Sequence, residues 1–144
     1  VGDGKGREKL EKFAKENNLK NVYFEGFKNQ SELPKFYSIA DVFILPSEYD
    51  PSPKAMQEAL NFNLPVIAST GVKTAPDIIL KGECGFIYKT GDIKKLANRI
   101  EEILKDKNLR FALGKNALST ASKWNYKESV KGIIKALEYL KAKS

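Results

Sequence analysis

The sequence predicts an α/β fold, a Rossmann-like doubly wound parallel sheet with helices on both faces, and three observations support this. Short apolar runs alternate with helical patterns along the whole chain. The run Asp41–Leu45 is apolar throughout after its first residue, which is typical of parallel strands covered on both faces. A chain of 144 residues, 42% of them apolar, suits one globular core. We therefore expect a single domain over residues 1–144.

Strands and helices are assigned in order from the spacing of apolar residues and from turn residues. The turn-rich start, Gly2–Gly6, is of a kind that connects a buried strand to a helix, so we expect a fragment of a longer chain. The expected elements are a helix over Arg7–Asn17, a strand over Asn21–Glu25, a helix from Ser31 to near Ala40, a strand over Asp41–Leu45, a helix over Pro53–Phe62, a strand over Pro65–Ser69, a short helix through Ile78 and Leu80, a strand over Gly85–Tyr88, and helices from Ile93, over Leu109–Ser122 and over Tyr126–Lys141.

In such a sheet, ligands bind outside the carboxyl ends of the strands. Four loops are expected there: Gly2–Gly6, Gly26–Ser31, Pro46–Ser52 and Thr70–Ala75. Any small ligand of this domain should therefore contact these loops.

Composition limits the classes of partner and site. The chain has no histidine and one cysteine, Cys84, which excludes a His/Cys metal cluster and an internal disulfide and indicates a cytoplasmic setting. The net charge of +7 is compatible with nucleic acid, an anionic membrane surface or a phosphorylated small molecule. Because the lysines are scattered rather than gathered on one face, a nucleic-acid partner is not expected, whereas a peripheral membrane contact stays open.

The stretch DVFILPSEYDPSPKAMQEALNFNLPVIAS, from Asp41 to Ser69, resembles the signature of family 4 glycosyltransferases. An apolar strand ends in Pro-Ser, two carboxylates follow with seven residues between them, and Pro-Val-Ile introduces the next strand. Three further stretches are similar to the family in the expected order: GDGKGREKLEKFAKENNLKNVYFEGF, GECGFIYKTGDIKKLANRIEEIL and KWNYKESVKGIIKALEYL.

This resemblance implies the donor-binding, carboxyl-terminal half of a two-domain GT-B enzyme, with the acceptor-binding domain absent. The implied reaction is a retaining transfer of a sugar, without metal or cofactor, from a UDP-, GDP- or ADP-sugar to a glycan or glycolipid acceptor. Cell-surface polysaccharide, glycolipid and glycogen synthesis all use this architecture, so the pathway stays open.

The resemblance assigns the carboxylate pair to Asp50 and Glu58. Glu58 is implied to accept hydrogen bonds from the two ribose hydroxyls, and Asp50 to contact hydroxyls of the donor sugar. Other interpretations stay open for both residues: glutamate is common on helix surfaces, and Asp50, like Ser52, is a good N-cap for the following helix.

Other positions are implied to bind the rest of the donor. Ser52, Pro53 and Lys54 lie where a helix amino terminus meets the phosphates, with Lys73 as a further lysine nearby. Gly26, Phe27 and Lys28 correspond to the loop that contacts the base. An Arg and a Lys that clamp the phosphates in the family are expected to lie before Val1.

The sequence departs from the family pattern next to Asp50. The first carboxylate is Asp rather than Glu, and the usual Gly-Phe-Gly is replaced by Pro51, Ser52 and Pro53. Two prolines remove two backbone N–H donors from a loop that normally holds sugar and phosphate. A non-catalytic or degenerate Rossmann-like interaction domain is therefore the alternative. A nucleotide-sugar epimerase fits poorly, since the chain lacks histidine.

Overall fold

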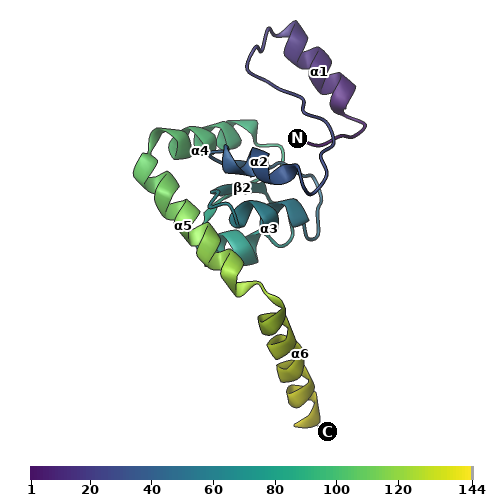
Figure 1. The fold of residues 1–144 in the computed structure, drawn as a ribbon, viewed down its shortest axis with the longest axis vertical. Coiled ribbons are helices and arrows are strands. Elements are labelled where there is room, and N and C mark those ends of the chain that lie inside the picture. The colour runs from purple at the N-terminus through teal and green to yellow at the C-terminus, as the bar shows by residue number, and fades with distance from the viewer. Residues whose placement is uncertain (144) are drawn as a thin grey trace. The chain divides into compact units, whose positions relative to one another are not determined.

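The computed structural model describes residues 1–143, whose contacts group the chain into two compact units, Val1–Ile39 and Ala40–Ser144. Figure 1 shows the helices and strands of both units along the chain. In chain order, the elements are α1 (Arg7–Glu16), α2 (Leu33–Ser38), β1 (Phe43–Leu45), α3 (Lys54–Leu60), β2 (Val66–Ser69), the π-helical turn η1 (Pro76–Leu80), β3 (Gly85–Tyr88), α4 (Ile93–Lys105), α5 (Lys107–Lys123) and α6 (Tyr126–Lys141).

The second unit contains a parallel sheet in the order β1-β2-β3. Ile67 of β2 is in register with Ile44 of β1 and with Phe86 of β3. All four residues of the central strand β2 are buried, which explains why the stretch is uniformly apolar up to Ser69. The predicted α/β class is therefore confirmed.

Helices cover both faces of this sheet, with α3 and α4 on opposite sides of β2 (Figure 1). On one face, Val66 and Ala68 of β2 belong to a core cluster with Met56 of α3. On the other face, Ile67 packs with Ile103 of α4. Because strand side chains alternate, one apolar strand supplies both cores.

Helix α5 contributes to both clusters, because Leu113 lies in the α4 cluster and Ala117 in the α3 cluster. At Gly114 this helix passes so close to the loop before β2 that a Cβ atom would lie 2.3 Å from the Asn63 carbonyl oxygen. Helix α5 thus packs against the loop at the amino end of β2.

In the first unit, the predicted strand over Asn21–Glu25 is absent, and the segment has no regular structure. The helix α1 forms as expected and buries Ala14. Val22 and Tyr23, which suggested the strand, are exposed. A strand needs a hydrogen-bonded neighbour, and no other strand is present among residues 1–39.

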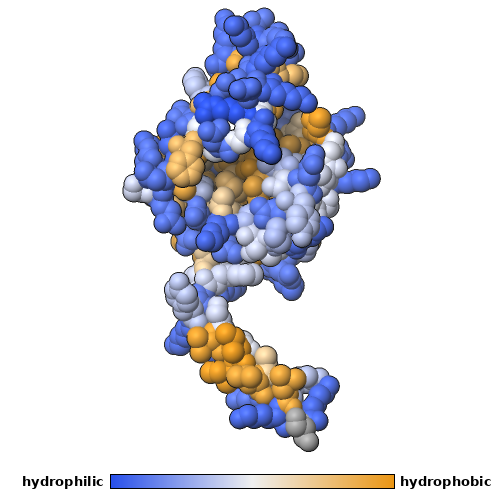
Figure 2. Space-filling model, turned by 90° about the vertical axis from the view of Figure 1, so that its right-hand side faces the viewer, coloured by the Kyte–Doolittle hydropathy of each residue, from blue (hydrophilic) through white to orange (hydrophobic). Residues whose placement is uncertain are grey.

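Helix α6 forms where the sequence predicted it, but none of its residues is buried. Its apolar side chains make a continuous stripe, the orange band in the lower part of Figure 2. The stripe consists of Val130, Ile133, Ile134, Leu137 and Leu140. Among residues 1–143, no helix is both long and apolar enough to cross a membrane.

Candidate functional site

Two loops at the carboxyl end of the sheet are joined by their backbones. The loop after β1 reaches α3, and the loop after β2 reaches η1. The Asp50 N–H donates to the Gly71 carbonyl oxygen at 3.0 Å, and the Lys73 N–H donates to the Asp50 carbonyl oxygen at 2.9 Å. The predicted loops Pro46–Ser52 and Thr70–Ala75 are therefore brought together at this edge.

Gly71 makes this contact possible. A Cβ atom at this position would lie 2.3 Å from the carbonyl oxygens of both Ser47 and Glu48. The buried Ser69 adds a second connection, since its hydroxyl donates to the Ser47 carbonyl oxygen and accepts from the Gly71 N–H at 3.2 Å. The loops are thus held by a glycine that leaves room and a serine that is fully hydrogen-bonded.

The partly buried Asp50 uses one carboxylate oxygen within its own loop, where Oδ1 accepts from the Ser52 N–H at 3.1 Å. This is an Asx turn and not a helix cap. The N-cap of α3 is Pro53, whose backbone is extended and which supplies no side-chain hydrogen bond. The alternative prediction that Asp50 or Ser52 caps the helix is therefore wrong, because Pro53 separates both residues from its first turn.

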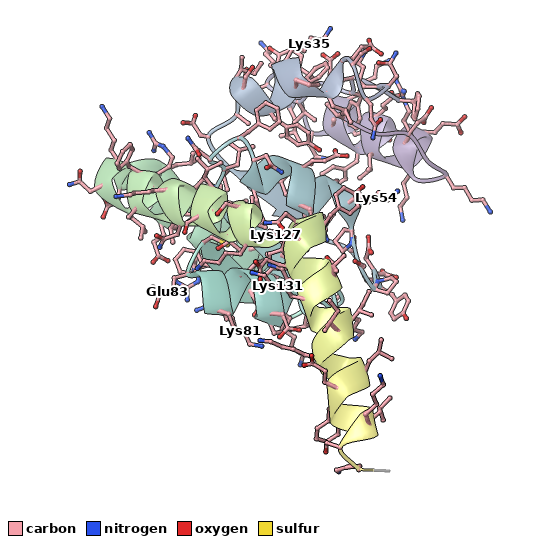
Figure 3. The ribbon with its side chains drawn as sticks, turned by 60° about the horizontal axis from the view of Figure 1, so that its bottom comes forward. Lys35, Lys54, Lys81, Glu83, Lys127 and Lys131 are labelled. Carbon is pink, nitrogen blue, oxygen red and sulfur yellow. The ribbon has the colours of Figure 1, made fainter. Side chains whose placement is uncertain are left out.

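Helix α3 carries the second predicted carboxylate, Glu58, on its partly exposed side. Met56, Ala59 and Leu60 of the same helix are buried, so the core determines which way the helix faces. Lys54 is the first residue of α3, and its side chain is exposed (Figure 3).

Lys73 lies beside the exposed ring of Tyr49, with Nζ at 5.8 Å from the ring centroid. This cation–π contact adds a third connection between the two loops. It places a positive charge close to the backbone bridge at Asp50.

The residues predicted to contact the base lie in the first unit. Gly26 has a φ of +68°, and its carbonyl oxygen accepts from the Gly2 N–H at 2.8 Å, so two predicted ligand loops meet there. The Phe27 side chain is 76% exposed. Lys28 is near Glu25, with Nζ and Oε2 separated by 3.8 Å. The Phe27 ring is thus not buried in the described structure.

A third loop, after β3, was missed from the sequence. It lines a cavity of about 440 Å³ together with the loop after β1 and the start of α4. The Thr90 N–H donates to Thr70 Oγ1 at 3.1 Å, and the two hydroxyl oxygens are also 3.1 Å apart. In the sequence, this loop could have been found from the turn residue Gly91 followed by the helix-capping residue Asp92. The Asp92 side chain caps α4 by accepting from the Lys95 N–H.

The cavity contains one acidic group and several apolar side chains. Glu48, Thr90, Ile93 and Leu96 line it, as does Tyr88. Burial raises the pKa of Tyr88, so its phenol stays neutral at ordinary pH. Among the described residues, Glu48 has no ion-pair partner.

A second cavity, of about 500 Å³, lies at the opposite, amino end of the sheet. Arg110 on its wall is engaged already, since its Nε lies 3.3 Å from the Asp41 carboxylate and its guanidinium donates to two backbone carbonyls of α4. Leu118 also lines this cavity and is exposed. The two cavities are thus separated by the length of the strands.

A family model and several known proteins match this chain. Residues 1–120 match the family model described as glycosyl transferases group 1. Over 130 residues, the chain is 31% identical to a sulfoquinovosyl transferase of Arabidopsis thaliana, covering 88% of this chain and 25% of that protein.

Solved structures with the same fold include a sucrose-phosphate synthase from Thermosynechococcus elongatus. It superposes with a TM-score of 0.80 at 31% identity, over 98% of this chain and 36% of that one. An Anabaena protein in complex with UDP-glucose has a TM-score of 0.80 at 24% identity, over 96% of this chain and 40% of that one. The chain therefore spans only about a quarter to two fifths of the length of these proteins.

Proposed function

Because this chain belongs to the glycosyl transferases group 1 family, we propose that it is the donor-binding domain of a retaining, family 4 glycosyltransferase. The observation that carries the proposal is the backbone bridge at Asp50, which holds a carboxylate between two loops at the carboxyl edge of the sheet. Parallel α/β sheets bind their ligands at this edge. Glu58 follows on α3 with seven residues in between, as the family signature requires.

In this proposal each carboxylate binds hydroxyl groups of the donor. Asp50 has one oxygen occupied by the Ser52 N–H, which orients the carboxylate and leaves the other oxygen to accept from a sugar hydroxyl. Glu58 accepts from the two ribose hydroxyls. Carboxylates suit both tasks, because an ionised carboxyl group only accepts hydrogen bonds and can accept several at once.

The diphosphate is the leaving group, and its charge has to be met by fixed donors in the transition state. The first backbone N–H groups of α3 have no partner within their helix, and Ser52, Pro53 and Lys54 lie where the helix begins. The exposed Lys54 ammonium group adds a positive charge there. Gly26, Phe27 and Lys28 contact the base, with the exposed Phe27 ring as its apolar surface.

The donor is a nucleotide sugar, and UDP-sugars are the first to test. The Anabaena structural relative was solved with UDP-glucose, which supports this order, and GDP- and ADP-sugars follow. The acceptor, a glycan or glycolipid, is bound largely by a second domain, so the isolated chain is inactive in transfer. We place the protein in the cytoplasm, in peripheral contact with membranes where the acceptor is lipid-linked. The proposed chemistry needs no bound metal or cofactor.

A non-catalytic interaction domain is the second candidate, and one observation favours it. Pro51 and Pro53 flank Ser52, whose N–H is already bonded to Asp50. The loop between Asp50 and α3 therefore offers no free backbone N–H to a phosphate. Under this candidate the fold would persist without nucleotide affinity.

Nucleotide binding by the 144-residue chain distinguishes the two candidates. We expect UDP, GDP or ADP, or one of their sugar conjugates, to shift the amide NMR signals of residues 50–58 and 26–28, with millimolar affinity. Glu58→Gln should weaken binding about tenfold or more, because a hydrogen bond to a charged acceptor is lost.

Glu83→Gln is the matched control, since this exposed glutamate, labelled in Figure 3, comes just before β3 and so lies at the amino end of the parallel strands, opposite Asp50. Its affinity should equal that of the unchanged chain. Absence of shifts with every nucleotide would reject donor binding and favour the non-catalytic candidate.

A further inference from the structure

The cavity over the start of α4 is built from segments that are separately fixed in place. Glu48 belongs to the loop that Gly71 and Ser69 hold against the loop after β2. Thr90 is held to Thr70 through its backbone N–H. Asp92 caps α4 and so fixes the position of Ile93 at the first turn. The cavity of about 440 Å³ is therefore lined by ordered groups.

Its polar groups suit neutral hydroxyl groups. Glu48 is exposed, and a carboxylate accepts hydrogen bonds. Thr90 lines the cavity, and its hydroxyl lies 3.1 Å from that of Thr70. When Thr70 donates in this contact, the Thr90 hydroxyl proton is left for a ligand. The cavity thus offers an acceptor and a donor without a cation, which disfavours phosphates and favours polyols.

Its apolar side chains suit the face of a sugar ring that carries C–H groups. Ile93 is 78% exposed although it begins a helix whose later residues pack on the sheet. Leu96 and the buried Tyr88 line the cavity with it, and none of these three side chains carries a charge at neutral pH. An apolar surface with a few polar groups at its mouth is the usual composition of a small-molecule site.

We infer that this cavity binds a neutral saccharide, namely the sugar of the acceptor that receives the transferred residue. Glu48 of the cavity and Asp50 of the proposed donor site belong to one loop, so both lie at the carboxyl edge of the sheet. Its role as the acceptor site rests on the proposed transferase function. Saccharide binding itself depends only on the groups that line the cavity.

The test uses amide NMR titration of the 144-residue chain with maltose, cellobiose and lactose, each with and without UDP. We expect at least one disaccharide to shift Glu48, Thr90, Gly91 and Ile93, with a dissociation constant in the millimolar range. Glu48→Gln and Ile93→Ser should each weaken saccharide binding about fivefold or more. Neither change should alter the UDP shifts at residues 50–58.

One matched pair of variants and one distant control make the result specific. Thr90→Ser keeps the hydroxyl and should bind the saccharide as before, whereas Thr90→Val should weaken it. Leu118→Ser, in the cavity at the other end of the sheet, should have no effect on saccharide binding.

No shift with any disaccharide, or shifts that survive both Glu48→Gln and Ile93→Ser, would overturn the inference. Saccharide binding without any nucleotide binding would instead support the cavity and reject the transferase function.

Discussion

Gly71 is the residue on which the proposed donor site depends most directly. Its missing side chain leaves space for the carbonyl oxygens of Ser47 and Glu48, at 2.3 Å from where a Cβ would stand. Gly71→Ala should therefore separate the loops and lower the free energy of unfolding by about 2 kcal/mol or more. Urea denaturation followed by circular dichroism measures this change.

The control for Gly71→Ala is Gly132→Ala, because a Cβ there would meet no atom within 4 Å outside its own stretch of helix. Gly132 is inside α6, so the alanine should raise helix stability by up to about 1 kcal/mol. Equal stability of Gly71→Ala and the unchanged chain, with unaltered amide signals at Asp50, would show that the loops are not held in this way.

Cys84 predicts a dependence of stability on pH. Burial raises the pKa of its thiol from 9.0 to about 11, and Sγ donates to the Ile78 carbonyl oxygen at 3.4 Å. The thiol ionises more readily in the unfolded chain, so its contribution to stability is complete below pH 9.0 and is lost as the pH rises to about 11. The loss approaches about 1.4 kcal/mol per pH unit.

Comparison with Cys84→Ala isolates the contribution of this thiol from that of the rest of the chain. The alanine variant is less stable at pH 7, but its unfolding free energy should fall less steeply between pH 9 and 11. Parallel curves for both proteins in urea titrations would disprove the assignment.

At the scale of elements, the junction of α4 and α5 depends on one side chain. Asp106 ends α4 and caps α5, where its Oδ1 accepts from the N–H groups of Asn108 and Leu109, both at 2.9 Å. Asp106→Ala should cost about 1 kcal/mol of unfolding free energy, whereas Asp106→Asn keeps the acceptor and should cost much less. Thermal melts of the two variants compare them directly. If they melt together, the cap does not stabilise the junction.

Elements with a clear apolar pattern were predictable from the sequence, except for one strand whose pairing partner is missing. The strands over residues 43–45, 66–69 and 85–88 and the helices α4, α5 and α6 lie within about two residues of where their patterns predicted them. The segment Asn21–Glu25 has the composition of a strand but no neighbour to bond to. Because no neighbouring strand is available, this segment stays irregular despite its β-propensity.

At the scale of the whole molecule, the position of the candidate site followed from the α/β class, but its details did not. The class places ligands at the carboxyl edge, and the loops after β1 and β2 do meet there. That Asp50 bonds Ser52 instead of capping α3 depends on the path of a proline-flanked loop, which residue types do not reveal. Glu48 was overlooked because no motif includes it.

The roles of Asp50, Glu58 and Phe27 stay predictions until binding is measured. The structure brings Asp50 and Gly71 into one bridge within the second unit, and it places Gly26 beside Gly2 within the first. The nucleotide titration is designed to report on both groups of residues at once.

The bridge at Gly71 also bears on how new specificities arise in such a domain. The loops after β1 and β2 fit each other through bare backbone, so an insertion or a bulkier residue in one displaces the other. Loops grafted singly from a relative would therefore misfit, whereas grafting both as one cassette preserves the contact. Evolution and protein engineers face the same constraint here: the two loops have to be exchanged together.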